Sequence, residues 1–155
     1  MEQDLEYRQQ LVKQYKKSAE PLFKYIPWLE RSAGNASSSN FRGQDIEENS
    51  ISFPVYDSTL MNFVKLAAKT ELMDRNYPYI YTRNHLRSHE DERKQIEKAS
   101  IKEWGILCGI LSKYVLEGRH KGQLWSQAVT ERIFLLTLLK MREILEYWDR
   151  PIDIV

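Results

Sequence analysis

The chain has 155 residues, which is the length of one ordinary domain. It contains 23 Lys and Arg and 22 Asp and Glu, so its formal net charge is +1. A hydrophobic content of 42%, including 4 Trp, 9 Tyr and 5 Phe, excludes a disordered chain. The single cysteine excludes an internal disulfide framework and a cysteine-rich zinc module. Charges of both signs are spread evenly along the chain, which argues against a histone-like or membrane-coating protein. We therefore expect a single domain spanning residues 1–155.

The sequence predicts neither an export signal nor a membrane-spanning helix. The stretch Met1-Glu2-Gln3-Asp4-Leu5-Glu6 is acidic and polar, whereas a signal peptide begins with basic residues and continues with an apolar segment. The most apolar run, Ile133–Leu139, has seven residues, and a spanning helix needs about 20. We expect a cytoplasmic protein that does not contact a membrane.

The first third of the chain predicts two helices and a loop. Apolar spacing predicts a helix over residues 3–17. Ser18-Ala19-Glu20-Pro21 then resembles a fresh helix start that continues to Arg31, because Pro is tolerated in a first turn. Residues 32–50 contain the low-complexity stretch from Gly34 to Asn40 and are predicted to be a flexible loop.

Two short edge strands and a helix are predicted in the middle of the chain. Residues 51–56 alternate apolar and polar positions, and Pro54 restricts them to an edge strand. A strong helix is predicted over residues 58–73. Residues 76–82 are predicted to be extended around Pro78, with three Tyr on one face.

The last part of the chain is predicted to be helical throughout. Residues 88–98 form at best a solvated helix, and Ser100 and Glu103 form a capping box that opens a helix to Glu117. Gly118 is expected to end that helix in a left-handed conformation, and Gly105 and Gly109 are expected where a neighbouring helix packs too close for side chains. With helices over residues 123–129 and 131–149, the prediction is a mainly α, single-domain helical bundle of about five to seven helices with short edge strands at 51–56 and 76–82.

Three stretches resemble a family of short, uncharacterised bacterial proteins, a domain of unknown function found in Gram-positive species and their mobile elements. They are Leu22–Glu30, then Pro54-Val55-Tyr56 with the helix that follows, then Leu116–Gly122 running to Lys140. The resemblance spans residues 20–145 and implies a bacterial, cytoplasmic, helical protein. It also implies a glycine in the turn near Thr130-Glu131-Arg132, where this chain has none. No activity is established for the family, so the resemblance transfers no catalytic residues.

The segment 75–87 is the main candidate site. It contains three Arg and three Tyr and no acidic residue, and Tyr and Arg are favoured where proteins recognise one another. Binding to another protein is therefore the first hypothesis, and single-stranded nucleic acid is the alternative, because Arg meets phosphate and Tyr stacks on bases. A structural interpretation stays open, in which the rings cover the edge of the core and the Arg residues pair with the acidic residues 90–92. The predicted partner-binding residues are Tyr77, Tyr79, Tyr81, Arg83 and Arg87.

Two weaker candidates remain. His85 and His89, four residues apart, would share a helix face and hold a metal as in a hydrolase, but Leu86 stands where a metalloprotease has its Glu. Arg119, His120 and Lys121 precede a predicted helix start and form a candidate anion-binding site.

No catalytic motif strengthens the hydrolase hypothesis. Cys108 lies in mid-helix among apolar residues and is expected to be buried. No nucleophile elbow, phosphate-binding loop or dinucleotide fingerprint occurs in the sequence. We therefore expect a non-enzymatic domain with no catalytic residues, no bound metal and no cofactor.

Overall fold

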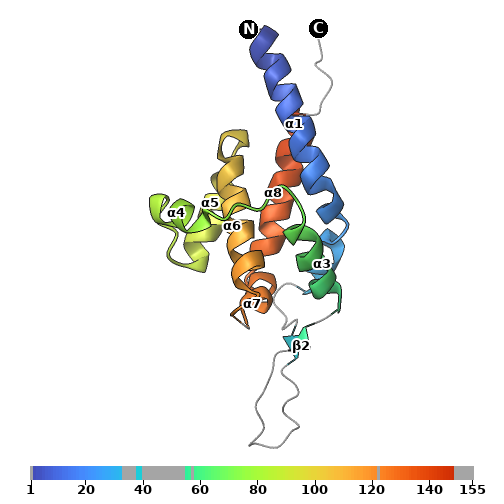
Figure 1. The fold of residues 1–155 in the computed structure, drawn as a ribbon, viewed down its shortest axis with the longest axis vertical. Helices are drawn as coiled ribbons and strands as arrows, with labels where there is room; N and C mark the ends of the chain where they lie inside the picture. Colours follow the sequence, from blue (N-terminus) through green and yellow to red (C-terminus); the bar gives the residue numbers. More distant parts are fainter. Residues whose placement is uncertain (1, 33–37, 40–54, 57, 122, 149–155) are drawn as a thin grey trace, which may run out of the picture.

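The structure is a computed structural model that describes residues 2–32, 38–39, 55–56, 58–121 and 123–148 (Figure 1). These residues form eight α-helices, one 3-10 helix and two paired strands of two residues each. The predicted mainly helical bundle is confirmed. In chain order the elements are α1 (Glu2–Phe23), α2 (Ile26–Ser32), β1 (Ser38–Ser39), β2 (Val55–Tyr56), α3 (Ser58–Ala68), α4 (Tyr77–Arg83), α5 (His89–Lys98), η1 (Ile101–Glu103), α6 (Trp104–Glu117), α7 (Leu124–Thr130) and α8 (Ile133–Trp148).

Helix α8 lies at the centre of the bundle and packs against α1, α2, α5, α6 and α7. Its apolar run is too broad for a helix with one exposed face, and Phe134, Leu138 and Met141 are fully buried. Phe134 meets the rings of Phe63 and Tyr114 edge-on, with centroids 4.9 and 6.1 Å apart. Aromatic rings therefore join α3, α6 and α8 in one core.

The predicted capping box at the start of the α6 region is confirmed. The backbone N–H of Ser100 donates to Oε1 of Glu103, and the Ser100 hydroxyl accepts from the backbone N–H of Lys102. Trp104, predicted to face inward, is buried and stacks on Tyr15 of α1 with ring centroids 4.4 Å apart. The cap therefore fixes the first turn of α6 where it packs against α1.

The extended segment predicted at 76–82 is wrong, because these residues form helix α4. Pro78 occupies the first turn, where the missing N–H of proline has no intrahelical partner to lose. The helical period places Tyr77 and Tyr81 on one face and Tyr79 on another, so the three rings do not share a face.

The three glycines in and directly after α6 lie in different structural environments. A Cβ at Gly109 would lie 2.7 Å from Cδ1 of Ile80, so α4 packs there too closely for a side chain, as predicted. A Cβ at Gly105 would meet nothing within 4 Å, so close packing does not explain this glycine. Gly118 is not left-handed as predicted, since its φ is −61°, and it is required because a Cβ would overlap the indole ring of Trp125.

Several helix and strand boundaries in the structure differ from those predicted from the sequence. Helix α1 runs without a break through Ser18 to Phe23, with Pro21 inside it, so the predicted restart at 18 is wrong. The predicted solvated helix at 88–98 is α5, which buries Glu92, Gln95 and Ile96. The short antiparallel pair joins Ser38 to Tyr56 and Ser39 to Val55, while the predicted loop over 33–37 and 40–50 and strand residues 51–54 lie outside the described residues.

Candidate partner-binding site

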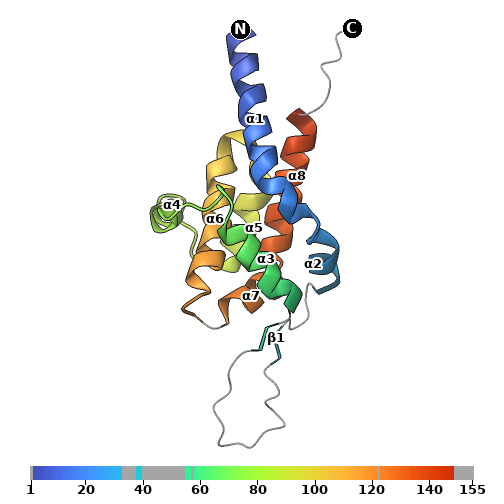
Figure 2. The same cartoon turned by 45° about the vertical axis from the view of Figure 1, so that its right-hand side comes forward.

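Helix α4 lies at the edge of the bundle in both views and packs mainly against α6 (Figures 1 and 2). Ile80 faces α6, because Gly109 leaves room for its side chain there. The turn after α4 is completed by His85, which has a left-handed backbone conformation with φ of 55°. These contacts hold one face of the short helix and leave the opposite face to solvent.

A buried carboxylate fixes the inner face of α4. Glu92 of α5 is only 2% exposed. Its Oε2 accepts from the hydroxyl of Tyr81, and its Oε1 accepts from the hydroxyl of Tyr114 at 2.6 Å. Nδ1 of His89 lies 3.1 Å from the same Oε1. One side chain therefore connects α4, α5 and α6 through hydrogen bonds that satisfy a group otherwise costly to bury.

The pKa of both Tyr81 and Tyr114 is raised above the usual range of a phenol. Burial is the main cause, and the neighbouring Glu92 carboxylate is the second. The ammonium group of Lys113 lies 4.5 Å from the centroid of the Tyr81 ring and 5.4 Å from that of Tyr114. Both phenols therefore stay protonated near neutral pH and act as donors to the carboxylate. Because Glu92 is enclosed and bonded to both tyrosines, the cluster supports the packing of α4.

The outer face of α4 carries Tyr79, which is 56% exposed, and Arg83 one turn later. Arg87 follows in the turn and is exposed too. Neither guanidinium group forms an ion pair or side-chain hydrogen bond with another described residue. The Arg–acid pairing considered from the sequence is therefore absent within the described part of the chain: Asp91 accepts from the backbone N–H of Arg87, and Glu90 pairs with Lys94.

A hollow of about 320 Å³ adjoins this outer face. Its lining includes Tyr79 and Arg83 from α4, Lys102 from η1 and Gly105 from α6. We call these four residues, together with the exposed Arg87 in the turn after α4, the α4 face. Sequence reasoning did not place Lys102 and Gly105 at this surface: Gly105 stood out as a glycine inside a helix but was attributed to close helix packing, and no sequence signal marked Lys102.

Of the five predicted partner-binding residues, Tyr79, Arg83 and Arg87 are exposed, and Tyr77 is half-buried. Tyr81 instead points inward to Glu92. The Tyr81 hydroxyl bonds to Glu92, and its ring lies beside Lys113 of the same chain, so Tyr81 does not belong to the candidate binding surface.

The two histidines are not on one helix as predicted, because His85 follows α4 and His89 begins α5. The left-handed turn at His85 separates the two helices. Among the residues that the structure describes, no group of three or more His, Cys, Asp and Glu is arranged to hold a metal ion.

The remaining candidates lie elsewhere in the bundle. Arg119, His120 and Lys121 are exposed in the turn before α7, and Nζ of Lys121 lies 3.0 Å from Oε1 of Glu117. Cys108 is buried as expected, and burial raises the pKa of its thiol to about 12. Such a thiol is protonated at neutral pH and is a poor nucleophile.

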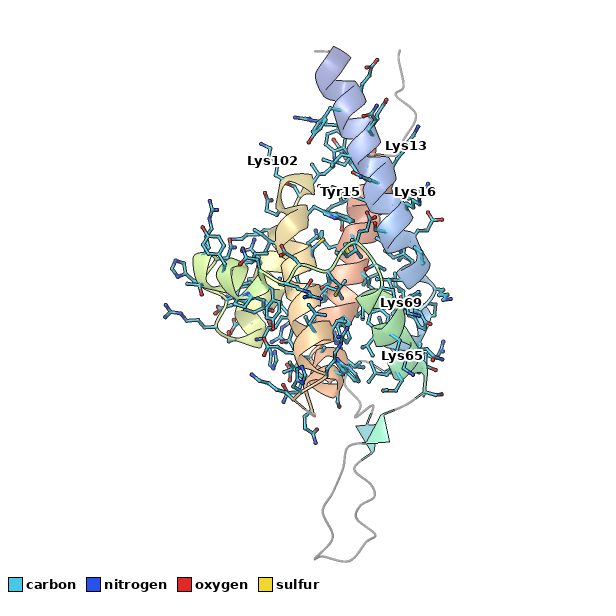
Figure 3. The ribbon with its side chains drawn as sticks, viewed as in Figure 1. Lys13, Tyr15, Lys16, Lys65, Lys69 and Lys102 are labelled. Carbon is cyan, nitrogen blue, oxygen red and sulfur yellow. The ribbon has the colours of Figure 1, made fainter. Side chains whose placement is uncertain are left out.

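A second basic surface covers α1 and α3, which lie side by side. Figure 3 shows Lys13 and Lys16 on α1, Lys65 on α3 and Lys69 in the turn just after α3. Nζ of Lys16 lies 3.9 Å from a carboxylate oxygen of Glu20. We call these four lysines the lysine strip.

The fold and the site define a mainly helical bundle with an exposed aromatic and cationic face. No family model, no curated protein and no solved structure matches the chain. The resemblance to the bacterial family therefore remains a prediction. Across the described residues, no helix combines the length and apolar character needed to cross a membrane.

Proposed function

We propose that this chain is a non-enzymatic interaction domain that binds a protein partner through the α4 face. The observation that carries the proposal is the exposed ring of Tyr79 beside Arg83, whose guanidinium group has no partner among the described residues. Tyr and Arg are the side chains most often found to dominate protein–protein binding energy.

The anchoring of α4 supports the proposal. Ile80 against Gly109 and Tyr81 against Glu92 hold the helix to the bundle, so its outer side chains start from a fixed backbone. A surface that is ordered before binding loses less conformational entropy on association. The same segment would bind more weakly if it were a free loop.

The charge of the face indicates what the partner carries. Arg83, Arg87 and Lys102 are exposed cations without described ion-pair partners, and Asp74 is the acidic residue that lines the hollow. We infer that the partner presents carboxylates around an apolar contact for Tyr79. The absence of a side chain at Gly105 allows the partner's backbone to approach α6 closely.

Capture of partners from a lysate of the producing organism tests this function. Wild-type protein is compared with Tyr79→Ala and with Arg83→Glu/Arg87→Glu, and captured proteins are quantified by mass spectrometry. Lys65→Glu/Lys69→Glu is the matched control, because it makes the same change in charge at the end of α3 and in the turn after it, away from α4. We expect a partner captured by wild type and control and lost in both α4 variants. Equal capture by all four proteins would show that the α4 face is not the binding surface.

A second candidate, nucleic-acid binding, is favoured by the lysine strip. Its cations come from α1 and from α3 with the turn that follows it, and they suit a phosphate backbone better than the lysines of one helix alone would. Binding of a single-stranded oligonucleotide, measured by fluorescence anisotropy, should then weaken steeply between about 50 and 200 mM salt. Lys65→Glu/Lys69→Glu should abolish it, whereas Arg83→Glu/Arg87→Glu should not. The reverse result would make the α4 face a nucleic-acid surface and overturn the protein-binding proposal.

A further inference from the structure

An aromatic groove lies at the end of the bundle opposite β2, between the first half of α1 and the end of α8. Its volume is about 820 Å³, and Tyr7, Arg8, Glu143, Tyr147 and Trp148 are among its lining residues. Tyr7 is 64% exposed and Tyr147 is 60% exposed, which is unusual for large aromatic residues. We call this feature the α1–α8 groove.

Charges of both signs line the groove: Arg8 of α1 and Lys102 of η1 are basic, and Glu143 and Glu146 of α8 are acidic. On the α1 wall, the guanidinium carbon of Arg8 lies 5.4 Å from the centroid of the Trp148 ring. On the α8 wall, Glu143 lies 3.5 Å from Nζ of Lys140, and Glu146 lies 3.9 Å from Nε of Arg142. Both carboxylates are solvent-exposed and pair with residues of their own helix, so these ion pairs hold them only weakly.

The shape of this end also matters. The first turns of α1 extend beyond the end of α8 in both views, so a projecting helix stands beside the groove (Figures 1 and 2). A projection next to a hollow that is lined by both basic and acidic residues is complementary to its own copy after a two-fold rotation. A partner with charge of one sign would match one wall and oppose the other.

We propose that a second copy of this chain occupies the α1–α8 groove and forms a two-fold symmetric dimer. In this dimer α1 of each copy lies in the groove of the other. Arg8 of one copy faces Glu143 and Glu146 of the second, while Tyr7 and Tyr147 from both copies form the apolar centre. Tyr79 and Arg83 of the α4 face do not line the groove, whereas Lys102 lines both surfaces, so the dimer presents two copies of the outer face of α4.

Sedimentation equilibrium over a range of micromolar concentrations tests the dimer. Wild type should associate reversibly, and Tyr7→Ser/Tyr147→Ser should stay monomeric while keeping the circular dichroism of the wild type. Arg83→Glu/Arg87→Glu is the control that separates this inference from the proposed function, and it should dimerise as wild type does. A wild type that is monomeric throughout, or aromatic variants that associate equally well, would overturn the inference.

Charge exchange makes the test specific. Arg8→Glu alone and Glu143→Arg/Glu146→Arg alone should each weaken association about tenfold or more, because like charges then face one another in both halves of the dimer. An equimolar mixture of the two variants should restore association, since every contact between the two unlike copies joins opposite charges. A mixture that associates no better than either variant would contradict the proposed pairing.

Discussion

The hydroxyl of Tyr114 lies 2.6 Å from Oε1 of Glu92, a carboxylate that is only 2% exposed. Tyr81 donates to the other oxygen of the same carboxylate. The two tyrosines come from α6 and α4, and Glu92 comes from α5. The Glu92 side chain therefore links α4 to the other two helices and fixes its position on the bundle. The orientation of Tyr79 and Arg83 therefore depends on a residue that does not belong to the proposed binding surface.

Glu92→Leu should destabilise the protein by about 2–5 kcal/mol, because it leaves two buried phenol hydroxyls without acceptors. Urea denaturation followed by circular dichroism measures this cost. Glu90→Leu is the matched control: it lies on the same helix and is exposed, so its effect should stay within about 0.5 kcal/mol. Equal effects of the two substitutions would mean that the Glu92 cluster contributes nothing to stability.

Stability should fall at alkaline pH. Burial, followed by the Glu92 carboxylate, raises the pKa of Tyr81 and Tyr114 in the folded state, whereas unfolded phenols ionise near pH ~10. The unfolded state then binds fewer protons than the folded state, so the free energy of unfolding decreases as pH rises above that value. Cys108, with its pKa raised to about 12 by burial, adds a loss in the same direction above its ordinary pKa.

Urea titrations between about pH 8 and pH 11 check this dependence. Tyr81→Phe/Tyr114→Phe should reduce the slope, and Tyr79→Phe, on the exposed face, should leave it unchanged. A stability that is flat across this range, or a slope untouched by the double substitution, would contradict the assignment.

Arg132→Gly should stabilise the protein by about 1 kcal/mol, because Arg132 has φ of 67° and a side chain is strained in the left-handed region. This is the turn in which the family resemblance implies a glycine. Gln123→Gly is the control, since its φ of −104° gives glycine no advantage. Thermal unfolding of both variants gives the comparison, and a loss of stability in Arg132→Gly would show that the turn is not strained.

The two glycines of α6 should respond in opposite ways. Gly105→Ala should stabilise the protein by about 1 kcal/mol, because its Cβ meets nothing and alanine favours the helix. Gly109→Ala should destabilise it, because its Cβ would lie 2.7 Å from Cδ1 of Ile80. Denaturation midpoints measure both, and a stabilised Gly109→Ala would mean that α4 is not packed on α6 as described.

The sequence predicted the elements whose signals are local. The capping box formed by Ser100 and Glu103 involves only residues close together in the chain, so it could be predicted from the sequence alone. Pro78 is compatible both with an extended segment and with the first turn of a helix, and its sequence neighbours do not decide between them. The contact of Ile80 with Gly109 and the bond from Tyr81 to Glu92 favour the helix, and both join residues far apart in the chain.

The site was predictable to a similar extent. Tyr79 and Arg83 follow from the composition of the segment 75–87, but Lys102 and Gly105 reach the same hollow from another part of the chain. Glu92 lies in a very polar stretch that predicts a solvated helix, and its burial depends on tyrosines from two other helices. Hydrogen bonds of this kind leave no periodic pattern in the sequence.

Site-specific photo-crosslinking tests the central claim, that the α4 face is the partner-binding surface, most directly. A photoreactive phenylalanine derivative replaces Tyr79 in one sample and Asn62, exposed on α3, in a control. Both proteins are irradiated in the producing cells, and adducts are identified by mass spectrometry. We predict one dominant protein adduct from position 79 that is missing from position 62 and is lost when Arg83→Glu/Arg87→Glu is added. No protein adduct from position 79, or the same adducts from both positions, would contradict the account.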